Sequence, residues 1–316
     1  MICKKPPTVH DQLVLLVEQL APRLGYNQTA LGCIRILRTE AVLNDIPVLY
    51  KPGAVFVLQG SKYGTLDGEI YLYDEDHYLA VSVPVPFRMT SKASPQRPLL
   101  AIYLEFDMQM AAEIAMQVEK LAGPPDAKPK GLFSSRMDSG IGDVLRRLLM
   151  ALGSPVEVAV LGGSILRELH YRVMSGPQGG AVIATLQRKG TSGKLVESVA
   201  WLRQNYGSEI AVADLARAVG MSVPSYHVHF KDLTGSSPMQ YVKALRLHEA
   251  RLMIARQIGT IAEAAASVGY ASAAQFSRDF RRHFGRTASE EVKWVQHHLG
   301  EQVRPSPDEL LQPDRW

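Results

Sequence analysis

The segments LARAVGMSVPSYHVHFKDLTG (215–235) and AAASVGYASAAQFSRDFRRHFG (264–285) repeat one pattern. Each has a short apolar run that ends at a glycine, a turn with a serine, and a second run with two aromatic residues four positions apart. The glycines are 49 positions apart and the serines 50, because Ala271 is inserted in the second turn. A helix, a tight glycine-containing turn and a second helix present that second helix to the major groove of DNA. The repeat therefore predicts two DNA-reading units in tandem.

The second helix of each unit should bury its aromatic face, since positions i and i+4 share one side of a helix. The residues between the aromatics should then point outward. Gln275 and Arg278 are predicted base readers, because these side chain types make bidentate bonds to adenine and guanine. Phosphate contacts are expected one turn later, and a solvated helix face is the alternative for each basic residue. The predicted DNA contacts are Pro224, Ser225, His227, Val228 and Lys231 in the first unit, and Ala274, Gln275, Ser277, Arg278, Arg281 and Arg282 in the second.

The segment between the two units predicts a long connecting helix, with Ser237 as its cap and Pro238 in its first turn. A helix over residues 238–256 would span about 28 Å at about 1.5 Å per residue. With the flanking turns, this length can place the two reading helices roughly 34 Å apart, which is one turn of DNA. The spacing therefore predicts that both helices enter successive major grooves on one side of the duplex.

The preceding part of the chain has a different pattern, with one predicted helix followed by short β-rich segments. An amphipathic helix is expected over residues 9–25, and Asp67-Gly68 is a two-residue hairpin signal between β-rich runs. Short β segments bounded by Gly, Pro or Asp favour an antiparallel sandwich or barrel. The expected strands are CIRILRT (33–39), AVFVLQG (54–60), EIYLYD (69–74), HYLAVSV (77–83) and PLLAIYLEF (98–106).

Helices are expected after the strands, and then a linker. Asp107 is the predicted cap of the first, residues 140–152 form the second, and Pro155 starts the third. The last two should pack as a hairpin that either dimerises or only covers the sheet. The fold class is therefore a two-domain α+β protein. Its parts are a sensing and dimerisation domain (1–175), a linker (176–193) with hinges at 175–180 and 188–193, a DNA-binding domain (194–298) and a disordered tail (299–316).

The charge, the apolar runs and the cysteine count of the chain favour some classes of function and exclude others. Residues 189–298 carry 14 basic and 9 acidic side chains, an excess of +5, whereas the whole chain of 316 residues has a net charge of +4. Phosphate binding requires such an excess. No apolar run reaches the roughly 18 residues of a membrane span, and the N-terminus lacks the apolar region of a signal peptide, so we expect a cytoplasmic protein. Two separate cysteines, Cys3 and Cys33, exclude a disulfide framework and a thiolate zinc site.

The segment RLHEARLMIARQIGTIAEAAASVGYASAAQFSRDFRRHFG (246–285) resembles the signature of the AraC/XylS family of bacterial transcription regulators. The first unit, with Gly220-Met221-Ser222 and TGSSPMQY (234–241), is similar to the first helix-turn-helix of that family. The resemblance covers about 100 residues and implies a sequence-specific regulator of promoter DNA. There are two departures: many members have Arg where this chain has Val228, and the usual Ser-Pro after the second unit is replaced by Thr287-Ala288.

The front of the chain resembles the N-terminal domain of a subgroup of these regulators, in GAVFVLQGSKY, YDEDHYLAVSVPVPF, SPQRPLL and RELHYRVMSGPQGG. The resemblance implies a cupin-like barrel with trailing helices that senses a signal and forms a homodimer, and contact with RNA polymerase if the protein is an activator. It names no ligand. Tyr50, Phe56, Tyr71 and Tyr103 are candidate effector-binding residues, for which ordinary core packing is the alternative.

A cupin-type metal enzyme with an accessory DNA-binding domain is the alternative function. Such enzymes need two closely spaced histidines, a carboxylate and a later histidine, whereas the β region offers only His77. His227 and His229 point to different sides of one helix and cannot chelate one ion. No phosphate loop or nucleophile elbow is present, so no catalytic residue, metal site or cofactor is predicted. A DNA-repair module would need a cysteine cluster, and a purely partner-binding protein would leave the repeat unexplained.

Overall fold

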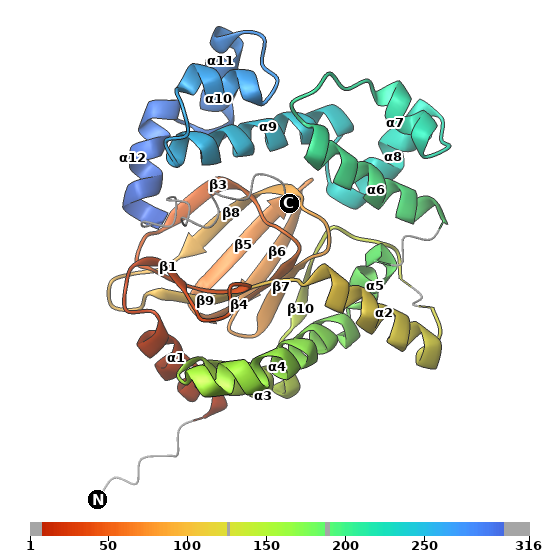
Figure 1. The fold of residues 1–316 in the computed structure, drawn as a ribbon. Helices are drawn as coiled ribbons and strands as arrows, with labels where there is room; N and C mark the ends of the chain where they lie inside the picture. The colour runs from red at the N-terminus through yellow and green to blue at the C-terminus, as the bar shows by residue number, and fades with distance from the viewer. Residues whose placement is uncertain (1–7, 125–126, 187–189, 300–316) are drawn as a thin grey trace, which may run out of the picture.

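The computed structural model describes residues 8–124, 127–186 and 190–299, and its centre is one curved antiparallel sheet (Figure 1). The strands are β1 (Gly25–Gln28), β2 (Ile34–Thr39), β3 (Leu43–Leu49), β4 (Gly53–Gln59), β5 (Ser61–Leu66), β6 (Glu69–Asp74), β7 (His77–Val81), β8 (Pro86–Lys92), β9 (Leu99–Glu105) and β10 (Leu132–Arg136). Their order is β1-β2-β9-β4-β7-β6-β5-β8-β3, with β10 paired to β7. The edge strands β1 and β3 do not pair with each other, so the cupin-like barrel implied by the resemblance is present as a half-barrel.

The hairpin predicted at Asp67-Gly68 is confirmed. Leu66 pairs with Glu69 across it, and Asp67 and Gly68 have φ angles of 48° and 82°. Two successive positive φ angles make the turn that matches the twist of the flanking strands. The five expected strands are present as β2, β4, β6, β7 and β9. The sequence prediction missed β1, β3, β5, β8 and β10, because Gly, Pro and charged residues interrupt their apolar pattern.

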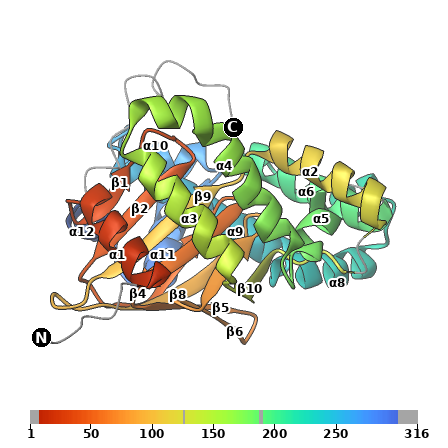
Figure 2. The same ribbon diagram turned by 90° about the horizontal axis from the view of Figure 1, so that it is seen from below.

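Five helices follow or precede the strands and cover one face of the sheet (Figures 1 and 2). They are α1 (Val9–Leu20), α2 (Met108–Ala122), α3 (Ser139–Leu152), α4 (Pro155–Ser175) and α5 (Gly180–Leu186). Asp107 caps α2 as predicted, with its carboxylate accepting from the amides of Gln109 and Met110. The first helix is shorter than expected, because the chain turns into β1 at Gly25. Ala54, Phe56 and Leu58 of β4 point into this layer and join its core.

Helix α5 lies inside the segment that the sequence suggested as a linker. Ala181, Val182 and Ile183 are buried in the core shared with α3 and α4. The glycines and the single proline of residues 175–180 therefore form a turn between two packed helices and not a free connection. The second expected hinge, 188–193, lies partly outside the described residues and then enters α6. The expected disordered tail also lies outside them, apart from residue 299.

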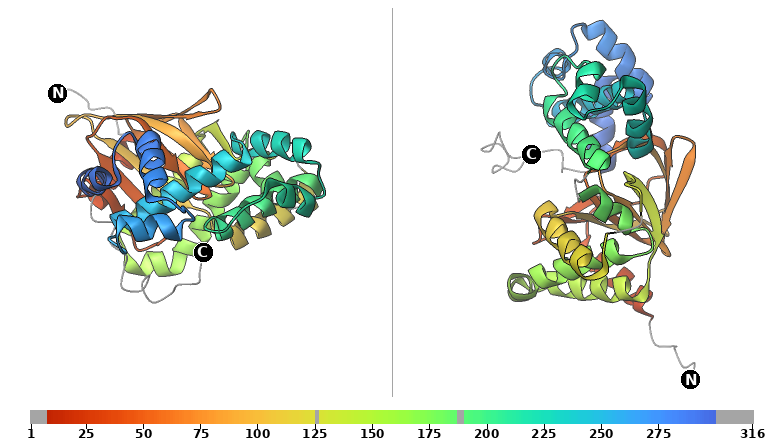
Figure 3. Two further views of the ribbon diagram at one scale, coloured as in Figure 1. Left: turned by 90° about the horizontal axis from the view of Figure 1, so that it is seen from above. Right: turned by 90° about the vertical axis from the view of Figure 1, so that its right-hand side faces the viewer.

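The remaining helices lie over the other face of the sheet (Figures 1 and 3). They are α6 (Gly190–Asn205), α7 (Val212–Ala218), α8 (Val223–Thr234), α9 (Pro238–Ala255), α10 (Ile261–Ser267), α11 (Ala273–Phe284) and α12 (Ala288–Leu299). Helices α9 and α11 contact β3 at one edge of the half-barrel, and α12 contacts β1 at the other. The C-terminal helices therefore cover the open side of the sheet. No helix in the described ranges is long and apolar enough to cross a membrane.

Candidate DNA-binding site

The predicted tandem helix-turn-helix units are present as α7–α8 and α10–α11. The glycine in each turn, Gly220 or Gly269, has a positive φ, 73° and 84°, which only glycine adopts without strain. Ser222 caps α8 by accepting from the amide of Ser225, and Ser272 caps α11 in the same way with Gln275. The matching caps and turns give the two units the same local fold, which confirms the repeat seen in the sequence.

The aromatic residues of each second helix point inward. Tyr226 and Phe230 of α8 and Phe276 and Phe280 of α11 have no exposed surface. Because they fix the rotation of each helix, the opposite face is presented to solvent. On α11 all six predicted contacts are exposed. On α8 Pro224, Val228 and Lys231 are exposed, whereas Ser225 and His227 are half-buried. Whether these residues touch DNA stays a prediction.

The charges on α11 divide into two groups. Neither Arg278 nor Arg281 has an ion-pair partner among the described residues, so both guanidinium groups face solvent. Arg282 instead pairs with Asp279, whose carboxylate also accepts from Lys243 of α9 at 2.6 Å. Burial of Asp279 opposes its ionisation, yet Lys243 and Arg282 hold its pKa below the ordinary value. Arg282 is therefore held by an ion pair within its own helix, whereas the exposed guanidinium groups of Arg278 and Arg281 are available to bind a phosphate or a base.

The first unit is docked on the half-barrel. The hydroxyl of Tyr241 donates to the Pro84 carbonyl at 2.9 Å, and the Gly131 amide donates to the Leu233 carbonyl at 3.1 Å. The β5–β6 hairpin reaches the end of α8, where Asp67 pairs with Lys231 at 3.0 Å. Tyr226, Phe230 and Tyr241 belong to one continuous core with residues of the sheet. Lys231, a predicted phosphate contact, thus already has a carboxylate partner from the other domain.

The second unit has a core of its own. Phe276, Phe280 and Phe284 pack with residues of α9, α10 and α12, apart from the core of the sheet. Its contact with the sheet includes a long hydrogen bond of 3.5 Å from Arg88 to the His283 carbonyl. The His283 ring lies against that of His248, with their Nε2 atoms 3.3 Å apart. Burial, with Arg88, Arg251 and Lys243 nearby, lowers the pKa of His283 to about 4.

Sequence reasoning left out two residues whose positions the structure shows. His229 is exposed on α8 beside Val228, and its outward position follows from the same helical spacing. Arg246 of α9 donates to carbonyls of both units, which the sequence could not reveal because its partners lie 23 to 40 positions away.

The candidate effector residues separate into two groups. Tyr50, Tyr71 and Tyr103 lie in the core between the sheet and the DNA-binding helices, with the rings of Tyr50 and Tyr103 5.4 Å apart. Phe56 points to the opposite face, against Tyr78. Lys62 is buried beside the tyrosines, and its ammonium donates to the Tyr50 hydroxyl at 3.4 Å. Burial lowers the pKa of Lys62 to about 8. Sequence reasoning missed this lysine, because strand β5 was itself missed.

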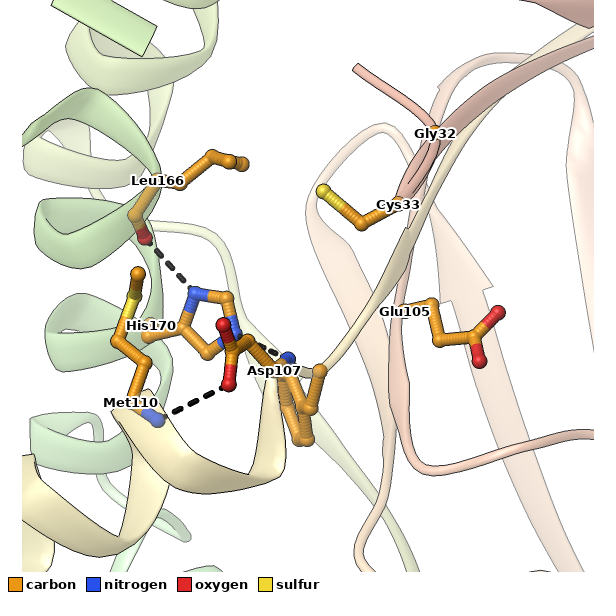
Figure 4. A pocket seen from close by; sticks show the side chains of 8 residues that line it. Gly32, Cys33, Glu105, Asp107, Met110, Leu166 and His170 are labelled. Atoms are coloured by element: carbon orange, nitrogen blue, oxygen red, sulfur yellow. Dashed lines mark hydrogen bonds between the residues drawn. The ribbon is translucent and has the colours of Figure 1, made fainter. Parts of the chain in front are cut away.

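A cavity of about 330 Å³ lies on the other side of the sheet, between the segment before β2, the end of β9, the start of α2, and α4 (Figure 4). His170 uses both ring nitrogens there, donating from Nδ1 to the Leu166 carbonyl and accepting at Nε2 from the Asp107 amide. Burial lowers the pKa of His170 and raises the pKa of the Cys33 thiol. A reactive cysteine needs a lowered thiol pKa, so the environment of Cys33 disfavours a nucleophilic role. Within the described ranges, no three His, Cys, Asp or Glu side chains form a metal-binding group.

Known proteins share both halves of this architecture. Residues 30–181 match the family described as the AraC-type transcriptional regulator N-terminus, and residues 215–293 match a helix-turn-helix domain family. The fold is that of a two-domain protein, with a half-barrel domain followed by two helix-turn-helix units. The chain therefore carries the N-terminal domain of AraC-type transcriptional regulators, followed by a helix-turn-helix domain.

The relatives found by sequence match over part of their length. The HTH-type transcriptional activator RhaS of Escherichia fergusonii is 30% identical over 95 residues, which are 30% of this chain and 34% of that protein. The lactose operon transcription activator of Staphylococcus xylosus is 30% identical over 102 residues, 32% of this chain and 35% of that protein. The chain thus spans about a third of the length of these relatives.

A solved structure shares the fold over most of the chain. Fatty-acid-bound ToxT from Vibrio cholerae superimposes with a TM-score of 0.60 at 10% identity, covering 90% of this chain and 99% of that one. At this identity the likeness concerns the fold alone. It places the half-barrel and the paired helix-turn-helix units in one known architecture.

Proposed function

We propose that this chain is a transcription regulator that binds promoter DNA in a sequence-specific manner, with α8 and α11 in successive major grooves. The observation that carries the proposal is the outer face of α11, where Gln275 and Arg278 stand exposed over a fully buried aromatic face. Their hydrogen-bonding groups match adenine and guanine edges. Arg281 adds an exposed positive charge one helical turn later, where a contact with a DNA phosphate is expected. The match to the N-terminal domain of AraC-type transcriptional regulators favours this function over a metal enzyme, and the proposed activity is binding without catalysis.

Selection from random-sequence duplex DNA by the full chain tests the proposal. We expect enrichment of a two-part site whose halves are one helical turn apart, and binding that weakens steeply with salt. The variant Arg278→Ala is the matched control for sequence reading, and Arg146→Ala on α3 is the control for loss of a positive charge away from the site. A pool that stays random after repeated selection would overturn the proposed function.

We propose that residues 1–175 act as the sensing and dimerisation domain and residues 194–298 as the DNA-binding domain, in cytoplasm, on double-stranded promoter DNA. The exposed apolar residues of the α3–α4 hairpin support a homodimer surface: Met150, Val156, Val160 and Leu161. Val160→Glu should shift the sedimentation of the chain from dimer to monomer. Unchanged sedimentation would exclude this surface. Contact with RNA polymerase is part of the proposal only if the protein activates transcription.

The core that joins the two domains supports a place for a small-molecule effector. Tyr50, Tyr71 and Tyr103 lie there with the buried ammonium of Lys62, which has no carboxylate partner among the described residues. A molecule that enters between the sheet and α9 would change how the DNA-binding helices dock, and thereby shift the population of binding-competent geometries. A thermal-shift screen of small molecules against the wild-type chain and Lys62→Met tests this: hits should stabilise the first and not the second.

A further inference from the structure

Arg246 is placed where the two helix-turn-helix units meet. Its Nε donates to the Tyr206 carbonyl at 2.6 Å and one terminal nitrogen donates to the Ser208 carbonyl at 2.7 Å. Both carbonyls lie in the turn between α6 and α7, at the entrance to the first unit. The other terminal nitrogen donates to the Gly269 carbonyl at 3.3 Å, in the turn of the second unit. One guanidinium on the connecting helix thus binds carbonyls of the turn that leads into the first unit and of the turn inside the second.

The backbones of the two turns also touch. A methyl group on Gly207 would lie 2.8 Å from the Ser267 carbonyl oxygen, and one on Gly269 would lie 2.5 Å from the Gly207 carbonyl oxygen. Real side chains do not tolerate such distances, so the close approach requires both glycines. Tyr206 packs on the core of each unit. We call this contact the joint: the turn at Tyr206, Gly207 and Ser208 packs against the turn at Gly269, and Arg246 donates hydrogen bonds to both.

The two units are connected along the chain by α9, which lies between them in Figure 1. The connection after α9 includes two residues with positive φ, Gln257 at 58° and Gly259 at 75°. The Arg246 contact is a second attachment between the two units. It restrains the second unit from rotating about the connection that follows α9. A rigid pair of reading modules gains affinity only for sites whose spacing matches its geometry.

We propose that Arg246 is the positioning residue that fixes the two reading helices relative to each other, so that the spacing between the DNA half-sites is read through it. The proposal rests on the proposed function, since it concerns how two units read one site. Arg246 itself touches no DNA. Its planar fork matters as much as its charge, because a lysine at this position could serve only part of the three carbonyls.

The first test uses duplexes enriched by the wild-type chain, with derivatives that carry inserted base pairs between the halves or a scrambled first half. Arg246→Ala and Arg246→Lys should bind the scrambled duplex as the wild type does. On the correctly spaced duplex, both variants should bind about tenfold more weakly than the wild type. Inserted base pairs should then reduce the affinity of the variants by a smaller factor than they reduce that of the wild type. Arg146→Ala should keep the wild-type profile. Equal losses on all duplexes, or no loss on any, would overturn the proposal, because either result leaves the spacing preference unchanged.

The second test needs no DNA, so it separates this proposal from the proposed function. Spin labels at Val228→Cys and Ser277→Cys, in a chain with Cys3→Ser and Cys33→Ser, report the distance between the reading helices. Arg246→Lys, checked for native circular dichroism, should broaden the distance distribution relative to Arg246. An unchanged distribution would overturn the joint even if the protein binds DNA as proposed, and a broadened one would support it even if selection finds no site.

Discussion

The two helix-turn-helix units have the same local fold but different surroundings. The first is part of the core of the half-barrel: its Tyr226 and Phe230 pack with residues of the sheet, and the β5–β6 hairpin pairs Asp67 with Lys231. The second keeps a separate core and presents Gln275 and Arg278 outward. In the proposed function, the first unit would receive a signal from the half-barrel and the second would read bases. Duplication of a fold did not duplicate its surroundings.

The largest expected difference is in stability. Phe230→Ala and Phe280→Ala remove equivalent, fully buried rings, and each should cost about 3–5 kcal/mol. Phe280→Ala should open the second unit alone, because its core contains no residue of the sheet. Phe230→Ala should instead lower the stability of the sheet and the first unit together. Hydrogen exchange and thermal unfolding measure both effects, and a uniform response to Phe280→Ala would contradict the separation.

The next difference concerns base reading. Arg278→Ala should cost about 1–3 kcal/mol at the selected site and relax the preference at one base pair. Val228→Ala, at the reading face of the first unit, should change affinity by about 0.5 kcal/mol or less. Affinities on single-base variants at fixed salt measure the contrast. Equal losses for the two variants would show that both units read sequence to the same extent.

A difference in pH response should follow from His283. Its folded pKa of about 4 lies below the ordinary 6.5, so the unfolded chain binds a proton first as the pH falls. This contribution to stability is complete above pH 6.5 and is lost progressively between pH 6.5 and 4. At pH 5.5 the loss should be about 1.4 kcal/mol, and it should appear in the second unit. His283→Gln should abolish it, and an unchanged pH profile in that variant would assign the effect to other groups, with His248 as the first candidate.

The smallest expected effect is at the contact between the hairpin and the first unit. Asp67→Asn should free Lys231 and raise DNA affinity by about 0.2–1 kcal/mol, because the pair is half exposed on both sides. The matched control is Glu69→Gln in the same hairpin, whose partner Lys130 lies outside the DNA-binding domain. The gain should shrink as salt rises. A gain of the same size in the control would point to the charge of the hairpin and not to the contact.

Much of this architecture follows from local rules. The repeat, the serine caps, the glycine turns and the buried aromatic faces could be predicted, since each depends on residues within one or two helical turns. Half of the strands could not, because β1, β3, β5, β8 and β10 carry polar or interrupted patterns and exist through pairing with distant strands. The same holds for Lys62, whose burial depends on β5 pairing with both β6 and β8.

The amino-acid sequence by itself determined that this chain has two helix-turn-helix units with buried aromatic faces, and that the second carries more side chains of the types that hydrogen-bond with bases. Only the tertiary structure decided that the first unit completes the core of the half-barrel and that α5 is packed and not a linker. It also decided that Arg246 holds both turns. The physical reason is range: caps, turns and helix faces are set by neighbours in sequence, whereas docking and joints are set by groups brought together from far along the chain.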